Sequence, residues 1–349
     1  MDAAAIRSLS SVESLPARVY FVCQNLGRWA DVLRGDDQMP AALDAEPDRV
    51  VTHEDMTIVQ TYVNLRRAGL AVRLIERPKE GALNVVSSID LKISHRTAQA
   101  FIVAFRGDWA RPELADVTLT MNSSIATRPN EFHLPHWVQT GLIPRDPLRG
   151  HRLENLVFKG DMVNLDPRFA DESFRRELGG LGVEFRTQPY DLNTSTSGWH
   201  DYSEVDAVLA IRDIHPNELS TKPASKLINA WAAGVPALLG NEPAFGELRR
   251  GPLDYVEISS PEEAVATVEL LRSQPDLYNA MVANGDERAA DYVNQRVAER
   301  WRSLLAGPVQ GFYSEWLSST RRQRERNFAV RAVRQKAANF AFKRRQSTR

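Results

Sequence analysis

Cysteine is almost absent from this sequence, and long apolar runs are absent altogether. Cys23 is the only cysteine in 349 residues, which excludes an internal disulfide and a cysteine-rich zinc site. A single thiol fits a reducing compartment, so we expect a cytoplasmic protein. No apolar run approaches the roughly 20 residues that a membrane-spanning helix needs. Residues 1–22 lack a basic segment followed by an apolar one and therefore predict no secretory signal.

Several well-known catalytic motifs are missing as well. The sequence contains no Walker A loop, no Gly-x-Ser-x-Gly elbow and no set of protein-kinase motifs. "LGGLGVEF", residues 178–185, mimics a dinucleotide fingerprint, but its glycines end a predicted helix instead of opening one. His133 and His136 have the spacing of metal ligands, but no cysteine lies near them. We expect these histidines to lie in a connecting segment, and we predict no metal site.

Positive charge is unevenly distributed along the chain. The net charge is −1, but residues 321–349 hold 11 Lys or Arg and one Glu, so this tail carries +10 and the other 320 residues carry −11. Such asymmetry predicts an anionic neighbour, either lipid or nucleic acid. Nucleic acid is disfavoured, because the body is acidic and no stacking aromatics accompany an RNA-binding motif.

The tail also has an apolar stripe at helical spacing, formed by Val330, Val333, Ala337, Phe340 and Ala341. A basic amphipathic helix of this kind can lie on an anionic membrane. The same stripe would equally let the tail pack against the rest of the protein. The sequence alone leaves both interpretations open.

Strands and helices alternate in two series. The first covers residues 18–122, and the second begins near residue 153 and includes a helix capped by Ser260. This alternation predicts α/β domains with parallel sheets. Residues 128–152 contain four prolines and no clear period, so we interpret them as a connection between two domains.

The segment "TKPASKLINAWAAGVPALLG", residues 221–240, has the clearest local pattern. Pro223 suits the first position of a helix, and Gly234 suits the stop at its end. With the apolar runs on either side, the pattern predicts strand, loop, helix and strand. A parallel crossover of this kind places the loop 212–222 at the carboxyl end of the sheet, where open α/β sheets bind ligands.

Three cationic residues surround the predicted start of this helix: Arg212, Lys222 and Lys226. Lys222 and Lys226 are four residues apart, so we expect them to face the same side. Cations at a helix N-terminus oppose the helix dipole by about 0.3–1 kcal/mol each, which favours a bound anion there. The sequence thus predicts an anion site, most simply for a diphosphate. A solvated helix face remains the alternative.

Residues 225–248, "SKLINAWAAGVPALLGNEPAFGEL", resemble the nucleotide-sugar-binding segment of GT-B glycosyltransferases, in which a helix ends in Ala-x-Gly-x-Pro and runs into a strand. The preceding "YSEVDAVLAIRD" and the connection "HLPHWVQTGLIPRDPLRG" are similar to the same family. The resemblance implies an α/β fold with two facing Rossmann-like domains. An acceptor domain would occupy residues 1–140, a donor domain 141–305, and a C-terminal helix with the basic tail 306–349.

GT-B proteins often return a C-terminal helix to the N-terminal domain. "FYSEWL", residues 312–317, is the expected start of that helix here. If the tail packs on the body only up to about residue 320, the rest of it remains available for a membrane.

The resemblance also implies the residues of the donor site. Lys222, Lys226 and Arg212 would hold the diphosphate of a nucleotide sugar, together with Gly160 at a strand end and Ser225 at the helix start. Basic residues and the helix N-terminus would take the diphosphate charge, so no metal is implied.

The sequence departs from the family pattern at two positions where many members carry a glutamate. Many retaining members carry Glu-x7-Glu, and Thr221 and Asn229 stand at those two places here. Asn229 can still hydrogen-bond a ribose hydroxyl, and whether the anomeric configuration is retained or inverted stays open. Glu242 and Glu247 follow the next strand, and either could hold ribose hydroxyls; we favour Glu247. The alternative is that both are surface carboxylates.

Asp108 is the candidate catalytic residue. It follows the apolar run "AFIVAF", and a carboxylate at a strand end can serve as general base for an acceptor hydroxyl. The alternative role is an N-cap for a short helix near Pro112. Arg145 and Arg149 either reach a phosphate or stay in solvent.

We therefore expect a metal-independent glycosyltransferase that moves a sugar from a nucleotide-diphosphate sugar to a glycan or lipid-linked acceptor in polysaccharide or glycan biosynthesis. The basic tail, residues 321–349, would contact the inner face of a membrane. Two alternatives remain. A nucleotide-sugar epimerase of the same fold would act without an acceptor, and a non-catalytic sugar-nucleotide-binding or scaffold protein would bind without turnover.

Overall fold

A computed structural model describes residues 9–33, 38–107, 109–191 and 197–346 of the chain. The chain divides into two compact units, which we name by their sheets. The six-stranded unit comprises Leu9–Leu43, Thr52–Pro135 and Gln295–Arg349. The described residues of the five-stranded unit are 44–51, 136–191 and 197–294.

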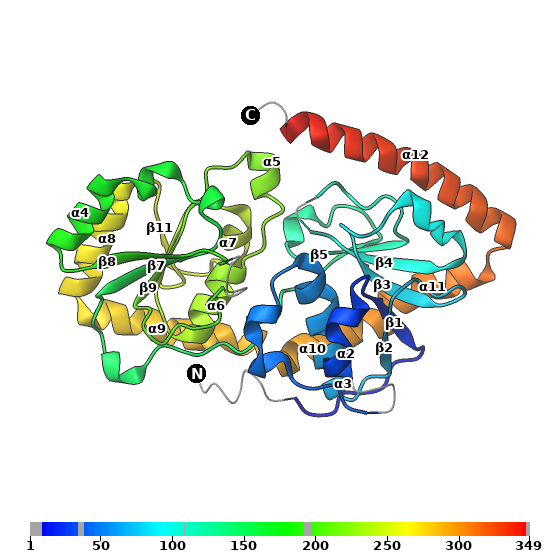
Figure 1. The fold of residues 1–349 in the computed structure, drawn as a ribbon, viewed down its shortest axis with the longest axis horizontal. Coiled ribbons are helices and arrows are strands. Elements are labelled where there is room, and N and C mark those ends of the chain that lie inside the picture. The colour runs from blue at the N-terminus through cyan, green and yellow to red at the C-terminus, as the bar shows by residue number, and fades with distance from the viewer. Residues whose placement is uncertain (1–8, 34–37, 108, 192–196, 347–349) are drawn as a thin grey trace. The chain divides into compact units, whose positions relative to one another are not determined.

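The sheet of the six-stranded unit is parallel throughout and has the order β2-β1-β3-β4-β5-β6 (Figure 1). Its strands are β1 (Val19–Val22), β2 (Val72–Ile75), β3 (Leu83–Ser87), β4 (Phe101–Phe105), β5 (Val117–Thr120) and β6 (Glu131–His133). All residues of β1, β3, β4 and β5 are buried, and their mainly apolar sequences are typical of strands in a sheet covered on both faces. The edge strand β6 lies inside residues 128–152, which we interpreted as a connection between domains. That interpretation was wrong for the residues of β6, because they belong to the sheet.

The helices of this unit come from two distant parts of the sequence. They are α2 (Ala30–Leu33), α3 (Gln60–Arg67), α10 (Asn294–Ala306), α11 (Pro308–Ser318) and α12 (Arg321–Gln346). A π-helical turn, Asp55–Val59, runs directly into α3. Short 3₁₀ helices lie at Leu26–Trp29, Leu43–Ala45, Ile93–His95, Thr97–Gln99 and Ser123–Ile125.

Helices α10 and α11 pack on one face of the six-stranded sheet. The indole of Trp301 on α10 contacts the rings of Phe21 and Phe105, with centroids 5.7 and 5.9 Å away. On α11, the ring of Tyr313 lies 5.3 Å from that of Phe101 on β4. The predicted return of a C-terminal helix to the N-terminal sheet is therefore confirmed, and buried aromatic rings hold it there.

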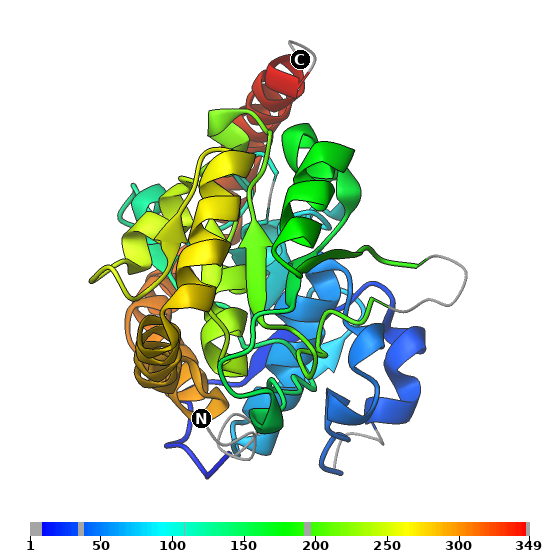
Figure 2. The same cartoon turned by 90° about the vertical axis from the view of Figure 1, so that its left-hand side faces the viewer.

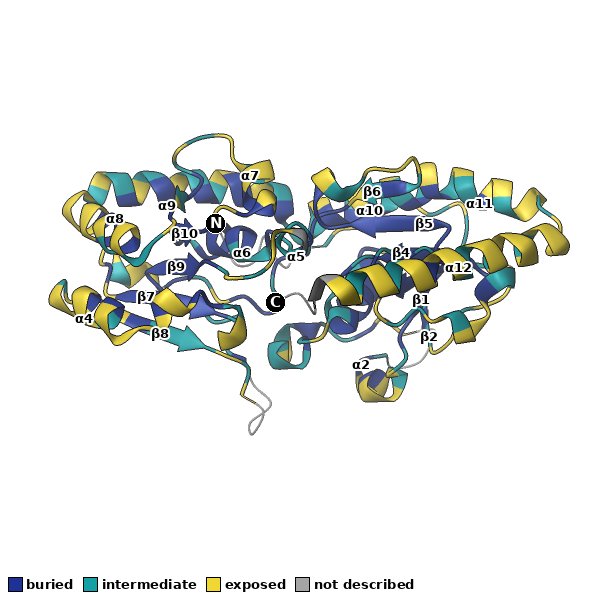
Figure 3. Cartoon of the chain, turned by 90° about the horizontal axis from the view of Figure 1, so that it is seen from above, coloured by how far each residue is buried: buried dark blue, intermediate teal, exposed yellow. Residues whose placement is uncertain are grey.

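The basic tail forms one helix, α12, with an inner and an outer face. On the inner face, Gln335 is buried, and its side chain hydrogen-bonds the backbone at Arg111 and Leu114. The outer face is exposed along the helix in Figure 3 and includes Val333 and Phe340, which are 69% and 65% exposed. Packing on the body and exposure of the apolar stripe are thus properties of opposite faces of one helix.

The five-stranded sheet is also parallel, with the order β11-β10-β9-β7-β8. Its strands are β7 (Asn155–Lys159), β8 (Glu184–Gln188), β9 (Ala207–Ala210), β10 (Ala237–Leu239) and β11 (Val256–Glu257). Its helices are α4 (Glu172–Gly180), α5 (Pro216–Leu219), α6 (Ser225–Ala233), α7 (Pro243–Leu248), α8 (Pro261–Ser273) and α9 (Pro275–Ala289). Short 3₁₀ helices lie at Pro47–Arg49, Pro147–Arg149, Met162–Asn164, Pro167–Ala170 and Ala290–Tyr292.

Alternate residues of each strand face two different cores in this unit. Leu156 and Leu209 belong to the core shared with α4 and α8, which run alongside the strands in Figure 2. Val157 and Val208 belong to the core shared with α6, where Trp231 is fully covered. The sheet is therefore sandwiched between helical layers, as the alternation of strands and helices predicts.

Both sheets run in the doubly wound order in which the second strand lies outside the first and the chain then crosses to the other side. The predicted pair of Rossmann-like domains is confirmed. The division of the chain differs from the expected one, however. Residues 295–305 were assigned to the C-terminal domain and 306–349 to a separate tail, whereas both group with the six-stranded unit. The reason is the aromatic packing of α10 and α11, which no local pattern shows.

Candidate functional site

The carboxyl edge of the five-stranded sheet is the place where this fold can bind a ligand. The chain crosses from one side of the sheet to the other between β7 and β9, and open α/β sheets bind ligands in the crevice at such a switch point. Gly160 follows β7 directly, and Arg212 comes two residues after β9. Glu242 follows β10, and Lys226 lies in the first turn of α6.

Lys226 is the centre of this edge. Its ammonium group donates a hydrogen bond to the backbone carbonyl of Lys159, the last residue of β7. The same nitrogen lies 5.0 Å from the centroid of the Phe158 ring. Burial, and next the positive charge of Arg212, lower the pKa of Lys226 to about 7. The lysine is therefore close to losing its charge at neutral pH and would gain much from an anionic partner.

Gly160 makes room for Lys226. A Cβ atom at this position would lie only 2.9 Å from the Lys226 Nζ, so no other residue fits without displacing the amine. Its φ of +147° also lies in a region that side chains disfavour. Two of the predicted binding residues, one at a strand end and one on a helix, are thus in direct contact.

Arg212 and Glu242 form a buried ion pair beside Lys226. Their side chains are 7% and 2% exposed, and an Arg212 N–H donates to one oxygen of Glu242. The other oxygen, Oε1, has no hydrogen-bond partner among the described residues. Burial raises the pKa of Glu242, although the charges of Arg212 and Lys226 oppose this. A buried carboxylate with a spare acceptor suits a hydroxyl donor.

The other predicted donor-site residues lie around this centre in different ways. Ser225 is the first residue of α6, at the end where backbone N–H groups are free. Lys222 lies before the helix, and its ammonium group is 3.6 Å from a carboxylate oxygen of Glu218. Because α6 begins at Ser225 rather than at Pro223, the expected helical alignment of Lys222 with Lys226 was wrong.

Asn229 and Glu247 are placed further along the same chain segment. Asn229 is buried on α6, where its side-chain oxygen accepts a hydrogen bond of 3.0 Å from the Gln139 backbone N–H. This bond fixes the connecting segment on α6. Glu247 is exposed on α7, whereas Glu242, the alternative carboxylate, is the one that contacts Arg212.

Arg145 and Arg149 have a structural role that the sequence analysis did not consider. Both pair with Asp206, which is fully buried, at distances of 2.7 Å. Asp206 precedes β9 and so lies at its amino end, opposite to Arg212. The prediction that these arginines reach a phosphate or stay in solvent was wrong, because both form ion pairs inside the five-stranded unit.

The carboxyl edge of the six-stranded sheet holds a residue that the sequence analysis missed. His53 Nδ1 lies 3.1 Å from Ser87 Oγ at the end of β3, and burial lowers the pKa of His53 to about 4. Gly107, which follows β4, leaves space for this ring, since a Cβ there would be 2.6 Å from Nε2. A lone histidine in a helix start gives no sequence signal of such contacts. Asp108, the predicted general base, lies outside the described residues.

Two further observations concern metals and membranes. His133 ends β6, and His136 begins the next part of the five-stranded unit. Within the described ranges, no group of three or more His, Cys, Asp or Glu side chains is arranged to hold a metal ion.

Among the described helices, none combines the length and apolar character needed to span a membrane.

The edge of the five-stranded sheet therefore combines a buried amine, a buried guanidinium, a carboxylate and a helix N-terminus. Cations and free backbone N–H groups converging on one point bind phosphate groups. A carboxylate beside them can orient neighbouring hydroxyls. The arrangement suits a ligand that has both phosphate and hydroxyl groups.

Comparison with known proteins places the fold. No protein-family model matches the sequence, and no curated protein matches it. Among solved structures, sucrose-phosphate synthase from Thermosynechococcus elongatus matches with a TM-score of 0.54 at 8% identity, over 86% of this chain and all of that one. HepE from Anabaena in complex with UDP-glucose matches with a TM-score of 0.50 at 9% identity, over 84% of this chain and 100% of that one.

A third structure, TarM, matches with a TM-score of 0.46 at 8% identity and covers 64% of this chain. The match covers 54% of TarM, so the chain spans about half the length of that protein. At these identities the similarity concerns the fold. The predicted GT-B fold, with two Rossmann-like domains in one chain, is thereby confirmed for this protein.

Proposed function

We propose that the protein is a glycosyltransferase that moves a sugar from a nucleotide-diphosphate sugar to an acceptor hydroxyl. The single observation that carries this proposal is the pair of buried cations, Lys226 and Arg212, at the switch point of the five-stranded sheet. The fold adds support, because HepE, which has the same fold, was crystallised with UDP-glucose.

In this proposal the two cations hold the diphosphate and stabilise the charge that develops on it as the sugar leaves. Lys226 now donates to a neutral carbonyl, and a phosphate oxygen would bring the opposite charge to this hydrogen bond. The N–H groups at the start of α6, including that of Ser225, would add further donors. With these groups neutralising the diphosphate, we propose that transfer requires no metal.

The remaining donor contacts are assigned by chemistry. Glu242 has a spare buried acceptor next to Arg212, so it is our first choice for holding a ribose hydroxyl, with Glu247 as the second. Lys222 would add charge from outside the helix. Asn229 uses its oxygen for Gln139, which leaves its amide N–H groups for a ligand. Asp108 remains the predicted general base for the acceptor.

The test is a thermal-shift panel with UDP, GDP, dTDP, CMP and ADP and with their sugar derivatives. A ligand present at about 100 times its Kd adds about 2.7 kcal/mol of stability, which displaces the melting temperature measurably. We expect one nucleotide to stabilise the protein and Lys226→Ala to lose at least tenfold in affinity, since a charged hydrogen bond contributes about 1.5–3 kcal/mol.

The matched control is Lys92→Ala, which removes an exposed lysine in the six-stranded unit. It should leave the nucleotide shift unchanged. Absence of any shift in the folded protein, or an equal shift in Lys226→Ala, would reject the donor site. Turnover of the nucleotide sugar without an acceptor would indicate an epimerase, and binding without any turnover would indicate a scaffold.

For the acceptor we propose a glycan or a lipid-linked glycan, with α12 on an anionic membrane surface. The outer face of α12 exposes Val330, Val333 and Phe340 in a helix that is otherwise rich in arginine. Vesicles containing phosphatidylglycerol should bind the protein in a flotation assay, and vesicles of phosphatidylcholine alone should not. A Val333→Ser, Phe340→Ser variant that floats equally well would remove α12 from this role.

A further inference from the structure

Helix α12 is held on the six-stranded unit by one stripe of side chains. The stripe has four members, which follow one another at intervals of seven, four and seven residues and so share one face of the helix: Arg324, Arg331, Gln335 and Phe342. The guanidinium of Arg324 lies 3.7 Å from the centroid of the Trp316 ring on α11. This contact anchors the start of α12 on the preceding helix.

The other three members of the stripe contact residues 109–116, an irregular segment that leads from β4 to β5. Gln335 uses both ends of its amide there: its nitrogen donates to the Arg111 carbonyl at 3.1 Å, and its oxygen accepts from the Leu114 N–H at 3.2 Å. Arg331 pairs with the buried Asp116, and the Phe342 ring lies 4.8 Å from that of Trp109. Since the segment has no helix or strand of its own, α12 supplies partners for its backbone.

The segment 109–116 comes shortly after the carboxyl end of β4. Gly107 lies at that end, where its N–H donates a hydrogen bond of 3.1 Å to Ser88 Oγ and its Cα lies against the ring of His53. Asp108, the predicted general base, directly precedes the segment in the sequence. The contacts of α12 therefore reach the chain on one side of this sheet edge, while Ser88 and His53 contact it on the other.

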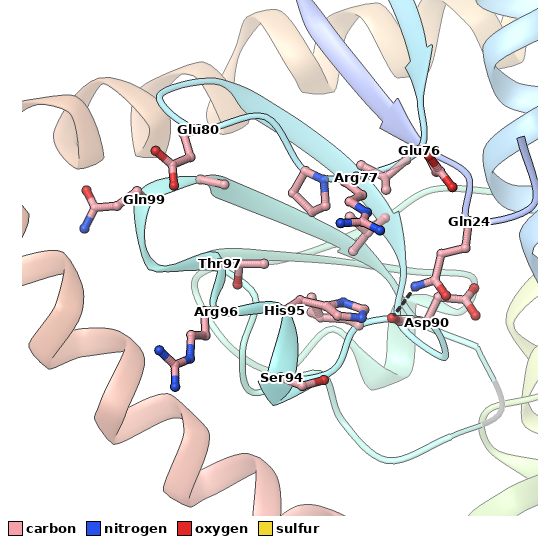
Figure 4. Close-up of a pocket in the computed structure, with 15 residues that line it drawn as sticks. Gln24, Glu76, Arg77, Glu80, Asp90, Ser94, His95, Arg96, Thr97 and Gln99 are labelled. Atoms are coloured by element: carbon pink, nitrogen blue, oxygen red, sulfur yellow. Dashed lines mark hydrogen bonds between the residues drawn. The ribbon is translucent and has the colours of Figure 1, made fainter.

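Helix α12 also packs against the 3₁₀ helix Thr97–Gln99, which lies beside it in Figure 4. Thr97 and Gln99 line an open cavity of about 600 Å³ in the same unit, whose other lining groups include Glu76 and Asp90. The 3₁₀ helix belongs to the crossover between β3 and β4, and residues 109–116 belong to the crossover between β4 and β5. Both crossovers lack an α-helix, and α12 covers part of each.

The charge of α12 makes the helix sensitive to its surroundings. Its 26 residues include ten Lys or Arg and one Glu, so like charges repel one another along it. An anionic lipid surface lowers this repulsion, and the exposed Val330, Val333 and Phe340 can enter lipid from one face only while the helix is formed. Docking of the inner stripe requires the same helical state. Lipid binding and docking therefore favour each other, as any two events that need one conformation do.

We propose that α12 couples membrane contact to the segment 109–116: anionic lipid on the outer face stabilises the helix, and Gln335, Arg331 and Phe342 then hold the segment in place. Gln335 is a positioning residue in this scheme, because it contacts the segment and no reacting group. The inference rests on the proposed function, in which the outer face of α12 meets the membrane. It adds that the membrane regulates the protein as well as locating it, so that transfer is fastest at the lipid surface.

Hydrogen exchange of the full chain, measured by mass spectrometry, tests this in solution and on vesicles of phosphatidylglycerol or phosphatidylcholine. We expect phosphatidylglycerol alone to slow exchange in residues 109–116. Gln335→Met keeps the side-chain length, and in solution its Leu114 N–H should exchange about tenfold faster because the acceptor is lost. The same variant should lose the lipid effect on the segment. Lys336→Met, an exposed neighbour on α12, is the matched control and should behave as the wild type does.

Three further readouts separate this coupling from a general loss of structure. Gln335→Met should keep slow exchange in β1 and β3, the thermal shift with nucleotide and flotation with phosphatidylglycerol. Phe342→Ala, near the end of α12, is a second variant with little risk to folding, and it should also weaken the lipid effect.

The inference is overturned if Gln335→Met exchanges like the wild type in residues 109–116. It is also overturned if phosphatidylglycerol vesicles bind the protein without slowing exchange there, or if Lys336→Met has the same effect as Gln335→Met. A wild-type protein that does not float with these vesicles rejects both the coupling and the proposed membrane role of α12. A missing nucleotide shift with an intact lipid effect rejects the proposed donor site alone.

Discussion

The two sheets of this protein have the same order for their first five strands but opposite charge where their strands end. In the five-stranded unit, Lys226 and Arg212 bring buried positive charge to the edge. In the six-stranded unit, Glu76 and Asp90 bring carboxylates to an open cavity. Strand order determines where a ligand can bind, and the crossovers determine which ligand that is.

The crossovers differ for a simple physical reason. Between β9 and β10 the chain forms α6, a helix of nine residues whose N-terminus has no side-chain cap. The crossovers 76–82 and 88–100 contain no α-helix, so they offer side chains around a hollow instead of a helix dipole. The first arrangement therefore brings positive charge to the strand ends, and the second leaves a hollow lined by side chains.

The largest expected effect concerns the amino end of the five-stranded sheet. Asp206→Asn leaves Arg145 and Arg149 without their buried counter-charge, and breaking a buried pair costs on the order of 3–5 kcal/mol. We expect the free energy of unfolding in urea to fall by that amount. Glu154→Gln removes the half-exposed partner of Arg149 and should cost less than about 1 kcal/mol. Equal losses in the two variants would contradict the structural role of Asp206.

A smaller effect is expected at Gly160, which follows β7 and lies against the amine of Lys226. Gly160→Ala combines an unfavourable φ with a Cβ 2.9 Å from the Lys226 nitrogen, and strained positions of this kind cost about 1–3 kcal/mol. We expect lower stability in thermal unfolding and a nucleotide Kd several-fold higher. Gly179→Ala, where a Cβ meets nothing within 4 Å, is the control. Unchanged nucleotide affinity in Gly160→Ala would separate Gly160 from the binding site.

A third effect follows from the lowered pKa of Lys226, about 7 in the folded protein. Only the protonated amine attracts a diphosphate, and the bound anion raises its pKa again, so binding takes up a proton. Nucleotide affinity should therefore fall as the pH rises above 7, by at most about tenfold per pH unit. Isothermal titration between pH 7 and 9 measures this, and Lys226→Arg, which stays charged, should show a flat profile.

Other charged groups face Lys226 and are part of the same measurement. The positive charges of Arg212 and Lys159 lower the pKa of Lys226, whereas the negative charges of Glu242 and Asp161 raise it. Lys159, whose pKa burial lowers to about 8, donates to Gln188 and to the carbonyls of Gly198 and Asp201. Its titration would be present in Lys226→Arg as well. The same slope in both proteins would assign the pH dependence to a group other than Lys226.

The smallest expected effect is that of replacing Lys222, which we had expected to face the same side as Lys226. Lys222 lies outside α6 and already has Glu218 as a neighbour at 3.6 Å. Lys222→Ala should raise the nucleotide Kd less than about fivefold, as for an ion pair worth 0.2–1 kcal/mol. Lys226→Ala should exceed tenfold in the same titration. A larger loss of affinity in Lys222→Ala would contradict this difference and support the prediction that both lysines hold the diphosphate equally.

Part of the site could be predicted because it depends on local pattern. Gly234 ends α6 in the left-handed conformation, with Ala-x-Gly-x-Pro leading into β10, as the residues themselves require. The resemblance to GT-B glycosyltransferases implied Lys226 and Gly160 as binding residues, and that role stays a prediction. Their direct contact was not predictable, because 66 positions separate them in the sequence.

The predictions failed where the partner of a side chain lies far away in the sequence. Arg145 and Arg149 looked like surface or phosphate-binding cations, yet Asp206, far along the chain, takes both charges. The alignment of Lys222 with Lys226 assumed that a proline opens the helix, and the helix begins two residues later. The cavity of the six-stranded unit gave no signal, since its residues come from several loops and have no common spacing.

By itself, the sequence determined the alternation of strands and helices and the buried parallel sheets, and it predicted an anion site in residues 221–240. These follow from hydrophobic period, glycine and proline positions, and charge, which act over a few residues. Only the tertiary structure decided that α10 and α11 join the N-terminal sheet, that Arg212 meets Glu242, and that a cavity opens beside Asp90. Such contacts depend on which distant surfaces bury one another, and that is a property of the whole chain.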